Sequence, residues 1–291
     1  MEEEPERRRR ERDDLAKELR RLREAADPTV AGRPATDPPG LNQREAAEFS
    51  GMSQPRISRI ERGEVVPEPA DVEKLCRLYG ASPGQTAKLA DLADSLHRKV
   101  EGAHAIMRGG VWRKQQQIAA VQAKAAHIGV YQPVLIAGLA QSRGYARTVY
   151  SLTLEGSKLE RSLEALHERQ HILNDSTKRI TFLLTEAAVR TRLCDDQVMV
   201  EQIDHLLDLA DRPHIDLGII PLDRRVREVP LTGFTIYDDQ LVTVGMETAT
   251  ATLTSRADLD HYARLFTLMK TAADTGDAVR ALLERIRATF E

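Results

Sequence analysis

The sequence has few cysteines, few aromatic residues and almost no net charge. Its 291 residues include 2 cysteines and 1 tryptophan, and aromatic residues make up 4%. Cys76 and Cys194 lie far apart in apolar-periodic segments, which predicts free, buried thiols rather than a disulfide. So few aromatic residues argue against a protein that stacks single-stranded nucleic acid on its rings. A net charge of -3 argues against one that coats nucleic acid through bulk charge.

Long apolar runs are also absent from the sequence. The most apolar stretch, residues 128–140, contains Gln132 and is shorter than the ~20 residues that a membrane-spanning helix needs. The N-terminus begins with Met1 and three glutamates, so it does not resemble a secretory signal. We therefore expect a cytoplasmic protein that has no membrane partner.

The first hundred residues have the pattern of a compact helical domain. Apolar residues at helical spacing, bounded by capping and turn residues, predict five short helices, at 6–26, 43–50, 53–62, 69–79 and from Pro83 onward. Four prolines and two glycines between 27 and 40 prevent a helix from continuing there and predict an insertion that loops out on the surface. The prediction for residues 1–100 is an all-α domain.

The pattern changes after a glycine-rich segment at 101–111, which predicts a linker. Helices are predicted at 112–127, 159–174, 186–193, 196–209 and 255–287, with a break near Gly276 in the last. Strands are predicted at 180–184, 214–221, 234–237 and 241–246. Helices mixed with non-adjacent strands predict that residues 112–291 form an α+β domain.

The segment from Gln43 to Gly63 has the spacing of a helix-turn-helix. Ala47 is small enough for two helices to cross closely, Gly51 suits the positive φ of a tight turn, and Ile57 anchors the second helix in the core. These positions lie inside the predicted five-helix frame, so the sequence predicts a five-helix helix-turn-helix domain followed by a mixed α+β domain.

Residues 12–80 resemble the phage-repressor/Cro-like, xenobiotic-response-element family of DNA-binding domains. The resemblance is carried by Leu41-Asn42-Gln43, Ala46-Ala47, Gly51-Met52-Ser53 and the run Ile57-Ser58-Arg59-Ile60-Glu61-Arg62-Gly63. It implies that double-stranded DNA is the partner and that the helix from Ser53 to Arg62 enters the major groove. The insertion at 27–40 departs from the family, which has a tight turn there.

The side chains of this helix suit base recognition. Gln54 can pair with adenine, and Arg56 or Arg59 can pair with guanine. By motif position, Gln54, Pro55 and Arg59 face the bases, and Pro55 offers only apolar contact.

Other side chains of the motif suit the DNA backbone. Gln43 matches the position whose side chain and backbone hold a phosphate. Ser53, Arg56 and Ser58 are further phosphate candidates. For Arg59 and Arg62, surface ion pairing with Glu48 or Glu61 is the alternative to contact with DNA.

Residues from about 112 to 287 resemble the uncharacterised domain that follows this DNA-binding module in many actinomycete regulators. The matching segments are Ile136-Ala137-Gly138-Leu139-Ala140-Gln141-Ser142, Tyr145-Ala146-Arg147, Arg169-Gln170, Ile172-Leu173, Glu186-Ala187-Ala188-Val189-Arg190, Ile219-Ile220-Pro221, Gly233-Phe234 and Glu247. The resemblance implies ligand sensing, dimerisation or binding of a small partner protein, and it supplies no catalytic residues.

Catalytic and metal-binding patterns are weak in the second half of the chain. His167 and His171 lie on one helix face, and Glu164 precedes His167 by three residues, but a third ligand such as His127 or His205 would have no diagnostic spacing. Surface histidines are therefore the preferred interpretation. Glu186, Arg190 and Glu247 suit either a polar pocket or a buried ion pair that supports the fold. We therefore expect no enzyme activity, no catalytic residue, no cofactor and no metal.

Together these features predict a sequence-specific transcriptional regulator that is associated with the nucleoid when it is bound to DNA. Residues 1–104 hold 19 basic and 21 acidic residues, which predicts weak non-specific binding and reliance on a homodimer at a two-fold operator. The helical segment 255–287 is the expected dimer surface. One alternative is the DNA-binding member of an antitoxin-like pair, whose second domain binds a small partner protein. The other is an enzyme tethered to DNA.

Overall fold

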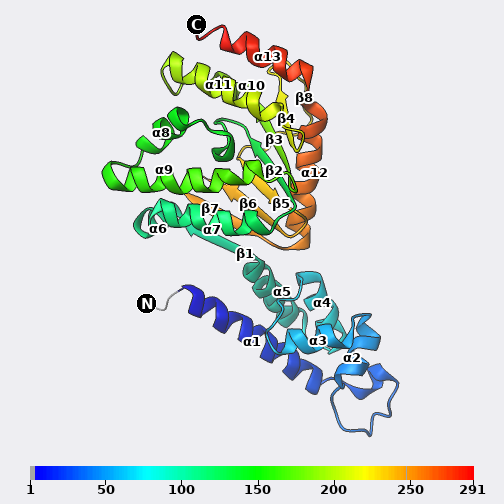
Figure 1. Cartoon of the computed structure of the whole chain (residues 1–291). Coiled ribbons are helices and arrows are strands. Elements are labelled where there is room, and N and C mark those ends of the chain that lie inside the picture. Colours follow the sequence, from blue (N-terminus) through cyan, green and yellow to red (C-terminus); the bar gives the residue numbers. More distant parts are fainter. Residues whose placement is uncertain (1–3, 247) are drawn as a thin grey trace. The chain divides into compact units, whose positions relative to one another are not determined.

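The computed structural model describes residues 4–246 and 248–291, and the chain divides into two compact units (Figure 1). The first unit extends to Lys99 and the second begins at Val100. The first consists of helices, and the second combines a β-sheet with helices, as the sequence predicted. Over the residues described, no helix is both long and apolar enough to cross a membrane.

The helices of the first unit pack around one apolar core. Their bounds are α1 (Glu4–Glu24), the 3-10 turn η1 (Pro28–Ala31), α2 (Gln43–Ser50), α3 (Gln54–Glu61), α4 (Pro69–Leu78) and α5 (Pro83–His97). The leucine stripe of α1, at Leu15, Leu19 and Leu22, is buried against Ile57 and Ile60 of α3 and residues of α4 and α5. This packing fixes α3 so that the side opposite Ile57 and Ile60 faces solvent.

The helix-turn-helix forms for the local reasons that the sequence indicated. Asn42 accepts hydrogen bonds from the backbone N–H groups of Arg44 and Glu45, and the Glu45 carboxylate accepts one from the Asn42 N–H, so α2 begins with a capping box. Gly51 ends α2 with φ 70°. Ser53 occupies the N-cap of α3, but within the described chain its hydroxyl makes no capping hydrogen bond.

The insertion at 27–40 is a closed surface loop. Asp27 caps η1 by accepting a hydrogen bond from the Thr29 N–H. At the base of the loop, the Gly40 N–H donates to the Ala26 carbonyl over 2.8 Å. Gly40 has φ 103°, and a Cβ there would lie 2.6 Å from the Glu24 carbonyl oxygen, so only glycine fits. The expected surface position is confirmed, since most of residues 29–39 are exposed.

The second unit is built on one mixed sheet whose described strands lie in the order β1-β7-β6-β5-β2-β3-β4-β8. The strand bounds are β1 (Arg98–Gly102), β2 (His127–Gln132), β3 (Arg179–Thr185), β4 (Ile215–Ile220), β5 (Phe234–Tyr237), β6 (Leu241–Gly245), β7 (Ala249–Leu253) and β8 (Asp274–Thr275). Strands β2, β3 and β4 run parallel, whereas β5 pairs antiparallel with β2 and continues into β6 and β7 as a meander.

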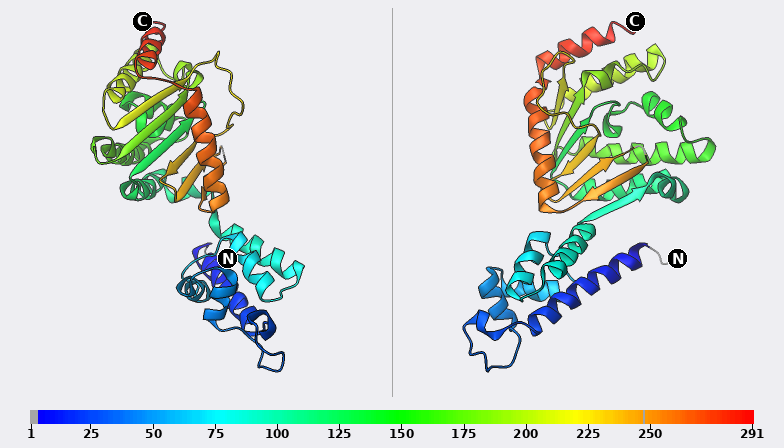
Figure 2. Two further views of the ribbon diagram at one scale, coloured as in Figure 1. Left: turned by 90° about the vertical axis from the view of Figure 1, so that its right-hand side faces the viewer. Right: turned by 180° about the vertical axis from the view of Figure 1, so that it is seen from behind.

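Helices cover both faces of this sheet (Figure 2). Their bounds are α6 (Ala103–Gly109), α7 (Val111–Lys124), η2 (Gly138–Ala140), α8 (Arg143–Ser151), α9 (Gly156–Gln170), η3 (His171–Asn174), α10 (Glu186–Arg190), α11 (Asp196–Ala210), α12 (Arg256–Ala272) and α13 (Asp277–Arg287). Helix α12 covers one face, where Leu265 and Met269 pack on Phe234 and Val242. Helices α11 and α13 lie on the opposite face. Burial on both faces explains why β3 and β4 are almost continuously apolar.

The expected linker at 101–111 is wrong. This segment contains the end of β1, all of α6 and the start of α7. The Ala103 N–H donates to the Thr248 carbonyl over 2.7 Å, and Lys114 forms an ion pair with Glu101. The glycines therefore end and join regular elements. Gly110, with φ 95°, is the junction between α6 and α7.

The helix expected at 112–127 is wrong at its end, because α7 stops at Lys124 and His127 begins β2. The backbone N–H groups of Ala126 and His127 donate to the Asp238 carboxylate in the turn between β5 and β6. That turn is more than a hundred residues away in sequence, so the local pattern could not reveal it. Helix α8 and strands β1, β7 and β8 were also not predicted.

Candidate nucleic-acid interface

The predicted DNA-contacting residues share the exposed side of α3. Side chains of Ser53, Gln54, Pro55, Arg56 and Arg59 are exposed and Ser58 is half-buried. The opposite side of the helix is anchored, because Ile57 and Ile60 are each 1% exposed. The helix therefore presents amide and guanidinium donors outward from a rigid base, and such groups can pair with base edges in a major groove.

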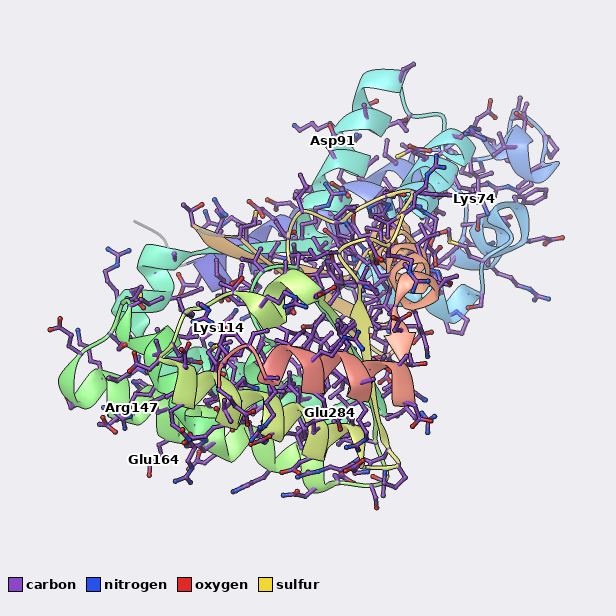
Figure 3. The ribbon with its side chains drawn as sticks, turned by 90° about the horizontal axis from the view of Figure 1, so that it is seen from above. Lys74, Asp91, Lys114, Arg147, Glu164 and Glu284 are labelled. Atoms are coloured by element: carbon purple, nitrogen blue, oxygen red, sulfur yellow. The ribbon has the colours of Figure 1, made fainter. Side chains whose placement is uncertain are left out.

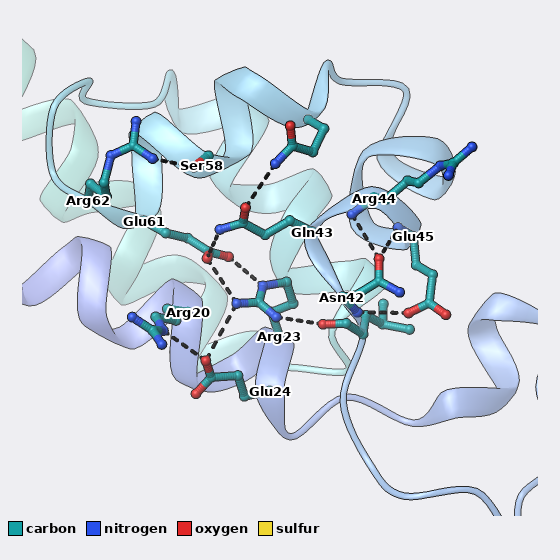
Figure 4. Close-up of polar contacts among 12 residues, drawn as sticks. Arg20, Arg23, Glu24, Asn42, Gln43, Arg44, Glu45, Ser58, Glu61 and Arg62 are labelled. Atoms are coloured by element: carbon teal, nitrogen blue, oxygen red, sulfur yellow. Dashed lines mark hydrogen bonds and ion pairs between the residues drawn. The ribbon is translucent and has the colours of Figure 1, made fainter.

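Gln43 is hydrogen-bonded to both Gln54 and Glu61, and Figure 4 shows it beside Glu61. The Gln54 Nε2 donates to the Gln43 Oε1 over 3.0 Å, and the Gln43 Nε2 donates to the Glu61 Oε2 over 2.9 Å. These two bonds orient both amide groups, so that the Gln43 oxygen faces Gln54 and the Gln43 nitrogen faces Glu61. The side chain of Gln43 thus orients Gln54 from the adjacent helix.

A buried ion pair completes this network. The Arg23 guanidinium donates from Nε to Glu61 Oε1 over 2.6 Å and from Nη2 to Glu61 Oε2 over 2.9 Å. Its Nη1 donates to the Leu41 carbonyl over 2.6 Å. The hydrogen bond to Glu61 raises the pKa of Arg23 above its usual value. A continuous chain of hydrogen bonds therefore runs from α1 through Glu61 and Gln43 to Gln54 at the surface.

The arginines of α3 have carboxylate neighbours other than those expected. Arg62 pairs with Glu64 over 2.6 Å, and Arg59 lies 3.9 Å from the same carboxylate. Glu61 pairs with Arg23, so the alternative considered for Arg59 and Arg62, ion pairing with Glu48 or Glu61, takes the form of contacts with Glu64 instead. Exposed contacts of this kind are weak, so they leave the arginines able to exchange a carboxylate for DNA.

Arg56 differs from Arg59 in how firmly it is held. Its Nη2 donates to the Asp71 Oδ2 of α4 over 2.5 Å. Among the described residues, Arg59 has only the long contact with Glu64, so it can reach DNA at a smaller cost than Arg56 can.

Sequence reasoning missed Arg23 and the inward orientation of Glu61. Both residues lie within apolar stripes, which was the available signal. Arg23 follows Leu19 by four residues on α1, and Glu61 follows Ile57 by four on α3. A charged residue in such a stripe is normally paired when it is buried.

Of the histidines considered as metal ligands, His127 and His171 are exposed, and His167 and His205 are half-buried. A cleft of 640 Å³ between α8 and α9 is lined by Glu164, His167 and His171 together with Arg147 and Glu160, which pair with each other. Figure 3 shows Arg147 and Glu164 at the periphery of this unit. Among the residues that the structure describes, no group of three potential ligands could hold a metal ion.

Glu186 and Arg190 form an ion pair over 2.6 Å, and the second carboxylate oxygen of Glu186 accepts from the Leu222 N–H over 2.9 Å. This arrangement connects the start of α10 to the end of β4. Of the two interpretations, a polar pocket or an ion pair that supports the fold, it fits the ion pair. Glu247, the third residue of that group, lies outside the described residues.

Two family models match the chain. A helix-turn-helix domain model matches residues 14–89, and a domain of unknown function, DUF5753, matches residues 115–285. The HTH-type transcriptional regulator PuuR of Escherichia coli strain K12 is 46% identical over 43 residues, which are 15% of this chain and 23% of that protein. PuuR of Shigella flexneri gives the same values. The chain thus spans about a quarter of the length of these curated relatives.

Solved structures resemble the chain only remotely. A phospholipase D family member, Nuc from Salmonella typhimurium, covers 62% of this chain and 97% of its own at 9% identity and a TM-score of 0.33. The archaeal chromatin protein TrmBL2, described as having a novel mode of DNA binding, covers 81% and 88% at 12% identity and the same TM-score. At this level of similarity neither carries an argument about the fold or the function.

Proposed function

The chain belongs to the family of the domain of unknown function DUF5753, and because it carries a helix-turn-helix domain before that domain, we propose that it regulates transcription from specific operators. One observation carries the specificity part of the proposal. Gln43 orients Gln54 on the exposed side of α3, while the apolar side of the helix is fixed in the core. Rigid placement of a recognition side chain favours discrimination between base pairs.

The orientation of Gln54 suits adenine. One N–H of its amide donates to Gln43, and the second N–H and the carbonyl oxygen remain for the N7 and N6 groups of the base. Arg59 lies about one turn further along α3 and is proposed to bind guanine O6 and N7. Pro55 is proposed to contact a thymine methyl group. Ser53, Arg56 and Ser58 are proposed to contact phosphates.

The operator is proposed to be two-fold, with a homodimer bound to it. One short recognition helix reads too few base pairs for useful specificity, and two half-sites double that number. The apolar residues of the expected dimer surface at 255–287 are used within the unit, because Leu265, Met269, Leu282 and Leu283 are buried. A dimer must therefore use other side chains. The second unit is proposed to sense a ligand or bind a small partner protein, without enzyme activity, cofactor or metal.

Selection of genomic DNA fragments by the purified full-length protein tests this proposal. We expect one enriched motif with two-fold symmetry. The protein is proposed to bind such sites at the nucleoid, in the cytoplasm. Repeating the selection at a higher salt concentration should lower the affinity, since phosphate contacts release counterions. A Gln54→Ala/Arg59→Ala double variant serves as the control and should retain the fold while losing the motif. No enriched motif with the wild-type protein would contradict the proposal.

A further inference from the structure

Part of the sheet face beneath α7 is polar, unlike the rest of the interior of the second unit. Thr235 and Tyr237 are two positions apart on β5, so both side chains lie on this face. Thr243 of β6 pairs with Thr235. Polar neighbours of the Tyr237 hydroxyl are Thr243, Thr235 and Gln122, and burial raises the pKa of this tyrosine. An interior surface with this composition needs hydrogen-bonding partners.

Arg169 of α9 contributes a cation to this polar region. Its Nη2 would lie 2.8 Å from a Cβ built on Gly138, so the guanidinium rests directly against the backbone of η2. Its electrostatic neighbours are the hydroxyls of Tyr150 and Tyr237, and burial lowers the pKa of Arg169. Burial raises the pKa of both tyrosines, so they are neutral at pH 7.

In the part of the chain that the structure describes, Arg169 has no carboxylate partner, and its Nε makes no hydrogen bond. This differs from Arg23, which is also buried but is paired with Glu61. A buried cation normally has an anion beside it, because desolvation of an unpaired charge is costly. The arrangement around Arg169 is therefore complementary to an anion that comes from outside the chain.

Two neighbouring glutamine side chains need a hydrogen-bond donor, whereas Arg169 needs an acceptor. The Gln115 Nε2 donates to the Tyr150 hydroxyl over 2.6 Å, which leaves the hydrogen of that hydroxyl for another acceptor. Gln115 is 8% exposed and Gln122 is 2% exposed. Within the described residues, the Oε1 atom of each has no hydrogen-bond partner. A complementary molecule would accept hydrogen bonds at Arg169 and Tyr150 and donate one to a glutamine oxygen.

A cleft leads from solvent to Tyr237. It has a volume of about 330 Å³ and is lined by α7 and by the turn between β5 and β6, including Lys124, Asp238 and Leu241. Tyr237 belongs both to this cleft and to the surroundings of Arg169. A cleft of this volume can admit a small molecule as far as Tyr237.

We propose that the second unit binds a small organic acid whose carboxylate contacts Arg169 and Tyr150 and whose O–H or N–H group donates to Gln115 or Gln122. One guanidinium with neutral neighbours matches the single charge of a carboxylate better than the higher charge of a phosphate. This binding site is independent of the DNA-binding proposal, because it involves residues of the second unit alone and is measured without DNA.

Thermal unfolding of the full-length protein tests the site with five probes at constant ionic strength. Lactate, alanine and propionate share a three-carbon acid skeleton, but propionate lacks the donor group, and alaninamide lacks the carboxylate. We expect a saturable rise in Tm with lactate or alanine, of about 5 °C once the acid exceeds its Kd ~100-fold. The rise should be smaller with propionate and absent with alaninamide and with inorganic phosphate.

Two arginines of α9 provide the matched variants. Arg169→Met should abolish the response to lactate and alanine, whereas Arg161→Met should retain it, because Arg161 lies over the Trp112 ring instead. Gln122→Leu and Gln115→Leu together should reduce the preference for lactate over propionate. If Arg169→Met does not fold, Arg169→Lys takes its place and should weaken lactate binding at least about tenfold, since lysine lacks the planar fork.

Two results would overturn the site. One is the absence of a saturable rise in Tm with all three acids. The other is an equal rise in the wild-type protein and the Arg169 variant, which would place acid binding elsewhere.

Discussion

Arg23 of α1 and Glu61 of α3 form a two-pronged ion pair in the interior of the first unit, with side chains only 9% and 4% exposed. The pair joins the first helix to the end of the recognition helix. Because Glu61 also accepts from Gln43, and Gln43 from Gln54, the position of a surface side chain depends on a buried charge pair. Stability and DNA recognition are therefore expected to be linked through these four residues.

Breaking the pair on one side should strongly destabilise the first unit. Arg23→Met leaves the Glu61 carboxylate buried without its counterion, and we expect a loss of about 3–5 kcal/mol in the free energy of unfolding. Urea unfolding of the full-length protein measures it. The control is Glu64→Gln, which removes an exposed ion pair and should cost about 1 kcal/mol or less. Similar small losses in both variants would contradict the role of the pair.

Gln43 and Gln54 should act as one unit in DNA binding. If Gln43 serves mainly to orient Gln54, then Gln43→Ala and Gln54→Ala should relax the preference at the same base pair. The double variant should lose less affinity than the sum of the single losses. Competition binding with operator variants measures the affinities of the two single variants and the double variant. Additive losses, with Gln43→Ala weakening all sequences equally, would show instead that Gln43 contacts only phosphate.

Gly51 should be sensitive to substitution because of its backbone and not because of crowding. Its φ is 70°, and apart from Gly51 itself and its two chain neighbours, no described residue has an atom within 4 Å of the place where a Cβ would be. Gly51→Val should lower the free energy of unfolding by about 1–3 kcal/mol, since a β-branched residue is strained at positive φ. Gly51→Asn should cost less, because asparagine tolerates this conformation. Equal costs, measured by thermal unfolding, would point to a steric cause.

Acid should weaken the second unit partly through Glu186. Burial raises the pKa of its carboxyl, but hydrogen bonds from the Leu222 N–H and Arg190 outweigh this, and the net shift is downward. A carboxyl with a lowered folded pKa stabilises the protein fully above its unfolded pKa, and this contribution is lost as the pH falls through the folded value.

The stability difference between the wild-type protein and Glu186→Gln should therefore be largest near neutral pH and should shrink below about pH 4.5. Urea unfolding across a pH series measures it. Glu160→Gln is the control, because Glu160 pairs with Arg147 at the exposed surface and should show little effect. A constant difference between pH 7 and pH 3 would contradict the role of Glu186.

The helix-turn-helix could be predicted from sequence because its signals are local. Asn42, Gly51 and Ile57 each act within a few residues, through a cap, a turn and an apolar stripe. The ion pair between Arg23 and Glu61 could not be predicted, since it joins residues 38 positions apart.

The sheet was predicted less completely for the same reason. Strands β3 and β4 are buried on both faces and stand out as apolar runs. β2 begins directly after a helix with a similar composition, and its pairing with β5 depends on contacts across more than a hundred residues. Short edge strands such as β8 carry too few residues for any periodicity. The polar surroundings of Arg169 come from separate elements, with Tyr150 on α8 and Tyr237 on β5, which no local pattern brings together.

The central claim, that α3 recognises specific base pairs, is tested most directly by repeating the DNA selection with Arg59→Ala. Arg77→Ala provides the control, because Arg77 is an exposed arginine on α4 and not on the recognition helix. We expect Arg59→Ala to lose its preference at one base pair in each half-site and about 1–3 kcal/mol of binding free energy on the wild-type motif. Arg77→Ala should select the wild-type motif. An unchanged motif and affinity for Arg59→Ala would contradict the placement of Arg59 at the bases.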